Sequence, residues 1–273
     1  MTSAFAAAGL DTPGRDARLL LTHALDMTPN ALLRDPGAPV PPAGAARLAS
    51  YMSRRLAREP VSRIIGRREF WGLSFEVTPD TLDPRPDSET IVAAVLDMVD
   101  QSWRREDALR ILDVGTGTGC LALSLLSELP NATACLTDIS PAALAVARRN
   151  ALHLGLSARV RAVVARGLAG LRGSFDILVS NPPYIPAGDI ATLAPEVRCY
   201  DPRLALDGGA DGLHIARELA QGLTTLVPNG IAVVELAPRQ THAFAELLEK
   251  LGPTAVIADL AGRPRCVAVK TRP

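Results

Sequence analysis

The sequence predicts an α/β fold, in which a mostly parallel sheet carries helices on both faces and follows a small helical N-terminal domain. Three observations indicate this architecture. Residues 1–58 show helical periodicity. From about residue 88 onward, short apolar runs alternate with helical segments, as in parallel sheets that are covered on both faces. The last two apolar runs follow each other without a helix between them.

The N-terminal helices are read from apolar residues that recur every three to four positions. Such spacing predicts helices at 17–25 and 45–57. Between them, the stretch 36–44 is rich in Pro and Gly, which predicts a break.

A hairpin is predicted where the helical pattern stops. Residues 61–78 contain Gly66 and Gly72, and apolar residues alternate after Gly72, which favours two short antiparallel strands. We therefore expect a helical domain over 1–58, a β-hairpin linker over 59–87 and an α/β domain over 88–273.

The α/β domain is expected to contain strands and helices in alternation. The predicted strands are 109–115, 132–138, 159–165, 175–181, 230–237, 254–259 and 265–270. The predicted helices are 89–99, 120–129, 141–154 and two near 211–225 and 239–251. The last two strands cannot be parallel neighbours, because a parallel crossover needs a dozen or more residues. An antiparallel strand at the end of such a sheet is typical of the Rossmann-like class I methyltransferase fold.

Composition excludes several classes of protein. The 29 basic and 29 acidic residues give a net charge near zero, without the basic surplus of proteins that grip nucleic acid by its phosphates. The four cysteines form no CxxC pair and the four histidines form no HExxH pattern, so no metal site is expected. The N-terminus has no basic start of a signal peptide, and no apolar run is long enough to span a membrane. We expect a cytoplasmic protein.

A glycine-rich loop follows the strand at 109–115. Gly115, Gly117 and Gly119 alternate with Thr116 and Thr118, and the loop opens a helix. Glycines permit a sharp turn and let a ligand lie against bare backbone. A dinucleotide fingerprint would require a third glycine at position 120, which is a cysteine. The observed glycine spacing after an acidic residue, Asp113, is the usual form for S-adenosylmethionine.

Asp138 ends the next predicted strand, 19 residues after Gly119. A carboxylate about 20 positions beyond such a loop can accept the hydroxyl hydrogens of a ribose. The alternative is an aspartate that caps the following helix. Loop and acid together favour cofactor binding.

Asn181-Pro182-Pro183-Tyr184 stands at the carboxyl end of the fourth strand of this domain, the edge where ligands bind in open α/β sheets. Two prolines make a stiff stretch with free carbonyls. The Asn181 side chain adds an acceptor and Tyr184 a flat face. Two acceptors that hold the NH₂ hydrogens can orient a weakly nucleophilic amide or aryl amine nitrogen toward a methyl donor. The alternative is a structural Pro-rich turn.

The chain resembles the PrmC/HemK family of release factor glutamine methyltransferases over most of its length. The resemblance is carried by EPVSRIIGRREFWGLSFEVTP (59–79), LDPRPDSE (82–89), ILDVGTGTGCLALSL (111–125), TDISPAALAVARRNA (137–151), FDILVSNPPYIP (175–186) and YDPRLALDGGADGL (200–213). The Asn-Pro-Pro-Tyr motif alone is shared with nucleic-acid methyltransferases, whereas REFWG and PRPDSE are far more specific.

The resemblance implies methyl transfer from S-adenosylmethionine, with S-adenosylhomocysteine as the product. The implied acceptor is the glutamine amide nitrogen in the Gly-Gly-Gln motif of class I peptide chain release factors, which the helical domain would help to hold. The implied catalytic residues are Asn181, Pro182 and Tyr184, and Pro183 joins them in substrate binding. The implied cofactor-binding residues are Gly115, Thr116, Gly117, Thr118, Gly119, Asp138 and Asn181.

Four positions differ from the usual family pattern. Asp83 and Ser88 replace an isoleucine and a threonine, and Asp201 replaces a glutamate before proline. Arg166 stands near the end of the third strand, where relatives commonly carry an acid near the adenine. Glu235 could face the site or cap a strand end, and the second is the simpler interpretation.

Three alternatives remain open at the level of sequence. A ribosomal-protein glutamine methyltransferase shares the site chemistry. A nucleic-acid amino N-methyltransferase shares the Asn-Pro-Pro-Tyr motif, although neutral charge and the short N-terminal domain disfavour it. A cofactor-binding module without catalysis is disfavoured because Asp138 and the Asn181–Tyr184 motif are both intact.

Overall fold

The computed structural model describes residues 1–34, 37 and 39–272. They form two compact units, one of Met1–Arg67 with Ala194–Tyr200 and one of Arg68–Leu193 with Asp201 onward. Part of the predicted Pro/Gly break, at residues 36 and 38, lies outside the described residues. The boundaries 1–58, 59–87 and 88–273 stay a prediction.

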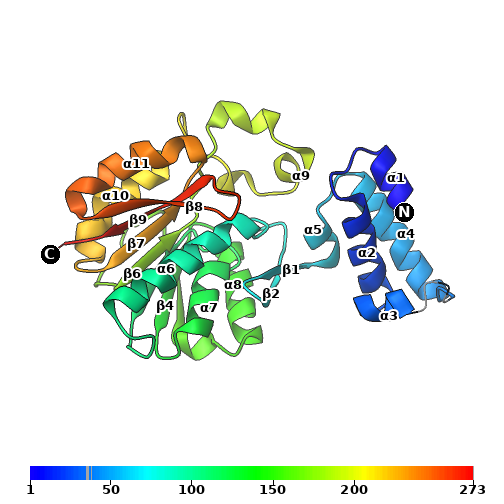
Figure 1. Cartoon of the computed structure of the whole chain (residues 1–273), viewed down its shortest axis with the longest axis horizontal. Helices are drawn as coiled ribbons and strands as arrows, with labels where there is room; N and C mark the ends of the chain where they lie inside the picture. The colour runs from blue at the N-terminus through cyan, green and yellow to red at the C-terminus, as the bar shows by residue number, and fades with distance from the viewer. Residues whose placement is uncertain (35–36, 38, 273) are drawn as a thin grey trace. The chain divides into compact units, whose positions relative to one another are not determined.

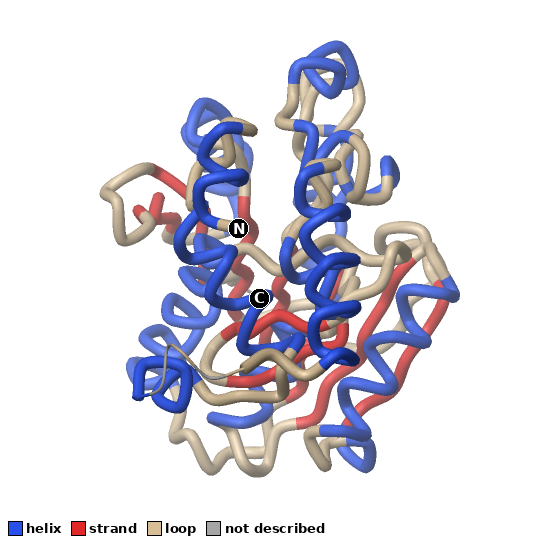
Figure 2. Tube along the Cα trace, turned by 90° about the vertical axis from the view of Figure 1, so that its right-hand side faces the viewer, coloured by secondary structure: helices blue, strands red, loops and turns tan. Residues whose placement is uncertain are grey.

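The N-terminal unit is helical, as expected, and Figure 2 draws it as blue helices joined by loops. Its helices are α1 (Thr2–Ala7), α2 (Pro13–Ala24), α3 (Pro29–Arg34), α4 (Pro42–Leu56), α5 (Val61–Ile65) and α9 (Pro195–Arg198). A small apolar core joins α1, α2 and α5, formed by Phe5, Leu10, Ala17, Leu20 and Ile64, and Tyr51 and Met52 of α4 pack against it.

Helix α9 belongs to this unit although it lies more than 120 residues further along the chain. Glu196 receives hydrogen bonds from Arg55 Nη1 at 3.1 Å and from Arg58 Nη2 at 2.9 Å. Arg55 also donates from Nε to buried Asp16 at 2.8 Å. The Tyr200 hydroxyl donates to the carbonyl of Ala57 at 2.8 Å. These contacts explain why the segment Ala194–Tyr200 packs with the helical unit.

The hairpin is shorter than predicted. Its strands are β1 (Arg67–Phe70) and β2 (Leu73–Glu76), whereas the first part of the predicted 61–78 segment is helix α5. That part of the prediction was wrong. Helix α5 follows Pro60, which is extended, and ends at Gly66, whose φ of 74° is left-handed.

The second unit confirms the predicted α/β fold. Its seven-stranded sheet has the order β5-β4-β3-β6-β7-β9-β8. The strands are β3 (Arg110–Val114), β4 (Thr133–Asp138), β5 (Val160–Val164), β6 (Ile177–Ser180), β7 (Ile231–Glu235), β8 (Thr254–Ala258) and β9 (Pro264–Lys270). Strand β9 is antiparallel to both β7 and β8, which confirms the antiparallel strand at this end of the sheet. It lies one place inside the edge strand β8.

Helices cover both faces of the sheet (Figure 1). One face carries α6 (Glu89–Ser102), α7 (Cys120–Glu128) and α8 (Pro141–His153), and the other carries α10 (His214–Leu226) and α11 (Thr241–Leu248). Successive strand residues point to opposite faces, so Ile111 packs into the first layer and Leu112 into the second. Within the described residues, no helix is both long and apolar enough to cross a membrane.

Candidate functional site

A cavity of about 490 Å³ opens at the carboxyl ends of β3, β4 and β6. Its walls include residues 114–118, 138–140, 165–167 and 181–183, together with Ser88 and Arg85. The structure thus brings the glycine loop, Asp138 and the Asn181–Pro183 stretch around one space. Of the predicted site residues, Gly119 and Tyr184 lie outside the cavity lining.

The glycine loop turns back on the neighbouring strand. The backbone N–H groups of Gly115 and Thr116 both donate to the carbonyl of Thr137 at 2.9 Å. Gly119 has a φ of 83° and begins helix α7, and a Cβ there would lie 3.0 Å from the Leu123 side chain. The turn therefore requires a glycine at this position.

Asp138 is held rigidly at the end of β4. Its Oδ2 accepts from the backbone N–H of Gly117 at 3.0 Å, and its Oδ1 accepts from that of Ser140 at 2.9 Å. A carboxylate offers about four lone-pair sites, so two bonds leave acceptor capacity for the hydroxyls of a ligand.

Asp113 supports the loop from inside the sheet, a role that the sequence did not indicate. It is fully buried, and its Oδ2 accepts from the Thr116 hydroxyl at 2.7 Å and from the N–H of Ala122 at 3.3 Å. Burial raises the pKa of its carboxyl to about 7.

The side chain of Asn181 is anchored through its nitrogen. Nδ2 donates to the Ser88 hydroxyl at 3.0 Å, so Oδ1 keeps its lone pairs for another donor. The preceding Ser180 hydroxyl donates to the carbonyl of Val114 at 2.7 Å and fixes the end of β6 to β3. Asn181 thereby presents an acceptor at a fixed place in the cavity wall.

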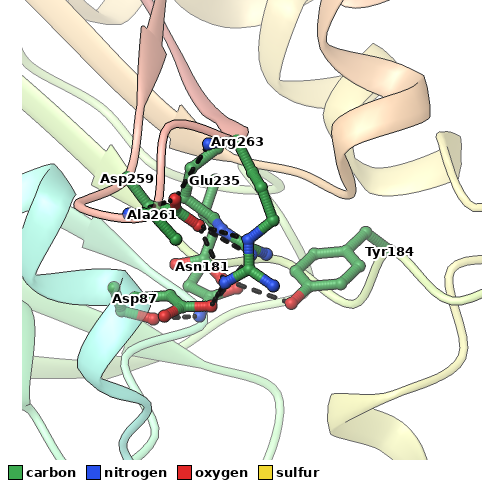
Figure 3. Close-up of polar contacts among 9 residues, drawn as sticks. Asp87, Asn181, Tyr184, Glu235, Asp259, Ala261 and Arg263 are labelled. Atoms are coloured by element: carbon green, nitrogen blue, oxygen red, sulfur yellow. Dashed lines mark hydrogen bonds and ion pairs between the residues drawn. The ribbon is translucent and has the colours of Figure 1, made fainter.

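Tyr184 is held at both ends. Its hydroxyl donates to Glu235 Oε1 at 3.2 Å, and its carbonyl accepts from Gln240 Nε2 at 2.9 Å. Figure 3 shows the hydroxyl directed toward Glu235, with Asn181 beside them. Burial raises the pKa of the Tyr184 phenol well above its usual value. The roles of Glu235 and Gln240 were not predicted, because no local pattern marks a buried partner.

Two further contacts shape the cavity wall. Arg85 Nη2 pairs with Asp201 Oδ2 at 2.5 Å, and the backbone N–H of Asp83 donates to Asp201 Oδ1 at 3.3 Å. These bonds tie the 82–89 segment to the loop after Asn181. Arg166 is exposed in the wall formed by residues 165–167.

The arrangement combines three parts: a glycine loop with accessible backbone, the Asp138 carboxylate as an acceptor for hydroxyls, and a stiff segment after β6 that carries the Asn181 acceptor. Cys120 is the one cysteine in the described lining, and burial raises the pKa of its thiol to about 12, so the thiol stays protonated at neutral pH. Among the described residues, no cluster of three His, Cys, Asp or Glu could hold a metal ion. The geometry suits binding and orienting two reactants.

Two family models match the chain: the PrmC N-terminal domain over residues 1–66 and the methyltransferase small domain over residues 93–195. Among curated proteins, a release factor glutamine methyltransferase of Cereibacter sphaeroides is 44% identical, over 97% of this chain and 94% of the relative. One of Rhodospirillum rubrum is 46% identical, over 97% of this chain and 81% of the relative.

Solved methyltransferases share the fold. The hMettl16 catalytic domain, solved in complex with a MAT2A 3'UTR hairpin, superposes with a TM-score of 0.59 at 16% identity, covering 84% of each chain. A methyltransferase from Pyrococcus furiosus superposes with a TM-score of 0.53 at 20% identity, covering 84% of this chain and 97% of that one.

Proposed function

The chain belongs to the release factor glutamine methyltransferase family, and we propose that it methylates the glutamine side-chain amide in the Gly-Gly-Gln motif of class I peptide chain release factors. The family resemblance drawn from the sequence is confirmed. As an S-adenosylmethionine-dependent methyltransferase, it uses a sulfonium methyl group as the electrophile. The observation that carries the proposal is the shared cavity of Asn181, Asp138 and the glycine loop.

The cofactor half of the cavity is assigned to the glycine loop and Asp138. We propose that S-adenosylmethionine lies against Gly115, Gly117 and the neighbouring backbone, with its ribose hydroxyls on Asp138. The support is that Asp138 is locked to Gly117 and retains free lone pairs. Thr116, Thr118 and Gly119 belong to the same proposed set, since they complete the turn that opens α7.

The acceptor half is assigned to the Asn181–Tyr184 stretch. We propose that Asn181 Oδ1 and the carbonyl of Pro182 accept the two hydrogens of the glutamine NH₂ group. The support is that Asn181 Nδ2 is occupied by Ser88, which leaves the oxygen to face a donor. Pro183 stiffens the stretch, and Tyr184 would pack against the flat amide.

These residues act by position and charge. An amide nitrogen is a poor nucleophile because its lone pair is delocalised into the carbonyl. Acceptors fixed on its hydrogens orient the nitrogen toward the methyl group and stabilise the positive charge that develops there. The proton can leave after transfer, so no side chain with a pKa tuned as a general base is required.

The substrate protein is proposed to be held in part by the helical domain 1–58, which matches the PrmC N-terminal domain model. A nucleic-acid substrate is disfavoured by the balance of 29 basic and 29 acidic residues. A ribosomal-protein glutamine would fit the same acceptors and is the nearest competitor. The cytoplasm, where translation terminates, is the proposed place of action.

The proposal is tested by following tritium from labelled S-adenosylmethionine into a purified class I release factor. Label should appear in the wild-type factor and vanish when the glutamine of its Gly-Gly-Gln motif is changed to alanine. Ribosomal proteins, DNA and RNA serve as parallel acceptors in the same assay. Equal or stronger labelling of any of these would overturn the acceptor assignment.

The site is tested in the same assay with Asn181→Ala. Loss of one positioning acceptor should lower turnover about 100-fold, which corresponds to roughly 3 kcal/mol. The dissociation constant of S-adenosylmethionine should change little. Asn131→Ala is a suitable control, because Asn131 is exposed, lies outside the cavity lining and donates from Nδ2 to the Glu106 carbonyl at 2.7 Å. Unchanged turnover in Asn181→Ala would remove Asn181 from the site.

A further inference from the structure

Gln240 is a buried side-chain amide behind the acceptor stretch. It ends the short turn Pro238–Gln240, which connects β7 to α11, and 5% of its surface is exposed. Gln240 lies outside the described lining of the cavity. Any effect that it has on the reactants must therefore pass through the residues that it bonds.

The Gln240 amide joins three separate segments of the chain. Its Nε2 donates to the carbonyl of Tyr184 at 2.9 Å and to the carbonyl of Asp211 at 3.0 Å. Its Oε1 accepts from the backbone N–H of Ala237 at 3.1 Å. Tyr184 follows β6, Asp211 precedes α10 and Ala237 follows β7. One side chain thus fixes the segment after β6 to two other loops.

The partners of Gln240 set the orientation of its amide. An amide nitrogen carries two hydrogens, and here both are directed at backbone carbonyls, while the amide oxygen meets a backbone N–H. An inverted amide would place its oxygen against two carbonyl oxygens and its NH₂ group against an N–H. A buried polar group without a partner is costly, so an apolar side chain could not replace Gln240 without loss.

The loop before α10 fits closely against the same part of the chain. A Cβ at Gly212 would lie 2.1 Å from the carbonyl oxygen of Tyr184, and a Cβ at Gly208 would lie 2.7 Å from that of Pro183. The backbone N–H of Gly208 donates to the carbonyl of Ile185 at 2.8 Å. Backbone therefore supports the acceptor stretch from behind, and Gln240 adds a side-chain bond at Tyr184.

The bond at Tyr184 comes where the stiffness of the acceptor stretch ends. Pro182 and Pro183 have their φ angles fixed by their rings, whereas the backbone of Tyr184 has no such restriction. The Tyr184 hydroxyl donates to Glu235 Oε1 at 3.2 Å, which fixes the tip of the ring. The Gln240 bond fixes the other end of the residue, at the main chain.

We propose that Gln240 is a positioning residue that fixes the main chain at Tyr184 and so holds the Tyr184 ring where the substrate amide packs. The inference rests on the proposed function, because that function assigns Tyr184 to the acceptor amide. A misplacement of about 1 Å in a site can slow a reaction about 100-fold. Loss of the Gln240 amide should therefore slow methyl transfer and leave cofactor binding unchanged.

The test is Gln240→Met, which keeps the length of the side chain and removes its polar atoms. We expect kcat to fall about 10- to 100-fold. The KM for the acceptor protein and the dissociation constant of S-adenosylmethionine should stay within about twofold of wild type. Urea unfolding should show a lower stability, because the carbonyls of Tyr184 and Asp211 lose a partner.

Thr271→Val is the matched control for this loss of stability. The buried Thr271 hydroxyl accepts from the backbone N–H of Gly230 at 2.9 Å and donates to the carbonyl of Val227. Its removal also leaves a buried N–H and a buried carbonyl without this partner. Gly230 precedes the amino end of β7, whereas the cavity lies at the carboxyl ends of the strands. Thr271→Val should therefore lower stability and keep the wild-type kcat.

Two further variants examine the route through Tyr184. Tyr184→Leu keeps an apolar side chain and removes the flat ring. The double variant Gln240→Met/Tyr184→Leu should be no slower than the slower single variant, because both changes act on the same contact. Gly212→Ala would place a Cβ 2.3 Å from Gln240 Nε2. It should reproduce the loss of kcat with an unchanged dissociation constant, and it tests the inference even if Gln240→Met does not fold.

The outcomes separate this inference from the proposed function. Labelling by the wild-type enzyme identifies the acceptor protein, and the ratio of variant to wild-type kcat on that protein decides the role of Gln240. The inference is overturned by wild-type kcat in Gln240→Met or in Tyr184→Leu. An equal loss of kcat in Thr271→Val, weaker cofactor binding in Gln240→Met or multiplicative effects in the double variant would also overturn it.

Discussion

The backbone N–H of Gly117 donates to Asp138 Oδ2 at 3.0 Å, so the glycine turn and the acid of the next strand are locked together. The bond leaves the Asp138 carboxylate in one orientation with acceptor capacity to spare. A ligand with hydroxyl groups to donate could therefore bind the Asp138 carboxylate and the glycine loop without a rearrangement of the loop or the side chain. Preorganisation of this kind lowers the entropic cost of binding.

Asp138→Asn should weaken S-adenosylmethionine binding about tenfold. Hydrogen bonds to a charged acceptor are worth about 1–1.5 kcal/mol more than those to a neutral one, and each 1.4 kcal/mol is a factor of ten. Calorimetric titration of the purified variant gives the dissociation constant. Asp97→Asn, an exposed change on α6, is the control. An unchanged constant would show that Asp138 only braces the loop.

Arg166→Asp should tighten S-adenosylmethionine binding several-fold. Arg166 is exposed in the cavity wall at 165–167, where family resemblance implies an acid near the adenine. A guanidinium has no acceptor, whereas a carboxylate can accept from an adenine amino group. The same titration measures the effect, with exposed Arg161→Asp as the control for a charge reversal nearby. Weaker or equal binding in Arg166→Asp would contradict an adenine contact there.

Gly212→Ala should destabilise the protein more than Gly170→Ala. The two glycines have similar φ values, 79° and 74°, so both substitutions carry the strain of a left-handed backbone, about 1–2 kcal/mol. A Cβ at Gly212 would also lie 2.1 Å from the Tyr184 carbonyl oxygen and 2.3 Å from Gln240 Nε2. A Cβ at Gly170 would meet no described atom within 4 Å beyond its own residue and its two chain neighbours.

Urea unfolding measures the difference. We expect Gly212→Ala to cost about 1–3 kcal/mol more than Gly170→Ala, the usual range for forced overpacking. Turnover should fall in Gly212→Ala alone, because Tyr184 must shift. Equal free energies of unfolding for the two variants would mean that the segment around Tyr184 can move away from the added Cβ without a loss of stability.

Local patterns predicted most of the fold. The strand from Arg110 to Val114 and its glycine loop carry their own signals, namely an apolar run and residues that permit a tight turn. The hairpin start was misread because Pro60 and Gly66 can begin and end a short helix as easily as they flank a strand. The boundaries of such short elements depend on tertiary packing rather than on the spacing of apolar residues in the sequence.

Long-range contacts account for what the sequence did not show. Glu196 joins the helical unit only because Arg55 and Arg58 meet it across more than 130 residues of chain. Glu235 looked like a strand-end residue, and its link to Tyr184 depends on the register between two strands. Neither feature has a local signature, since each partner is an ordinary charged residue in its own segment.

Asp113→Asn should make the protein more stable than wild type at neutral and alkaline pH. Burial raises the pKa of the Asp113 carboxyl to about 7, so the folded state retains a proton that the unfolded chain releases near pH 4. The stability of the wild type must then fall as pH rises from about 4 to about 7 on account of this group. Its Oδ1 has no partner among the described residues, so an amide should lose little by replacing it.

The measurement is the free energy of unfolding of wild type and Asp113→Asn in urea from pH 4 to pH 9. The two free energies should differ least near pH 4 and diverge up to about pH 7. Above that pH the difference should stay constant, on the order of 4 kcal/mol at most. The amide oxygen can still accept from Thr116 and Ala122, which preserves the loop. Asp97→Asn should show no such divergence. A constant difference across this range would mean that Asp113 is already ionised in the folded protein at pH 4.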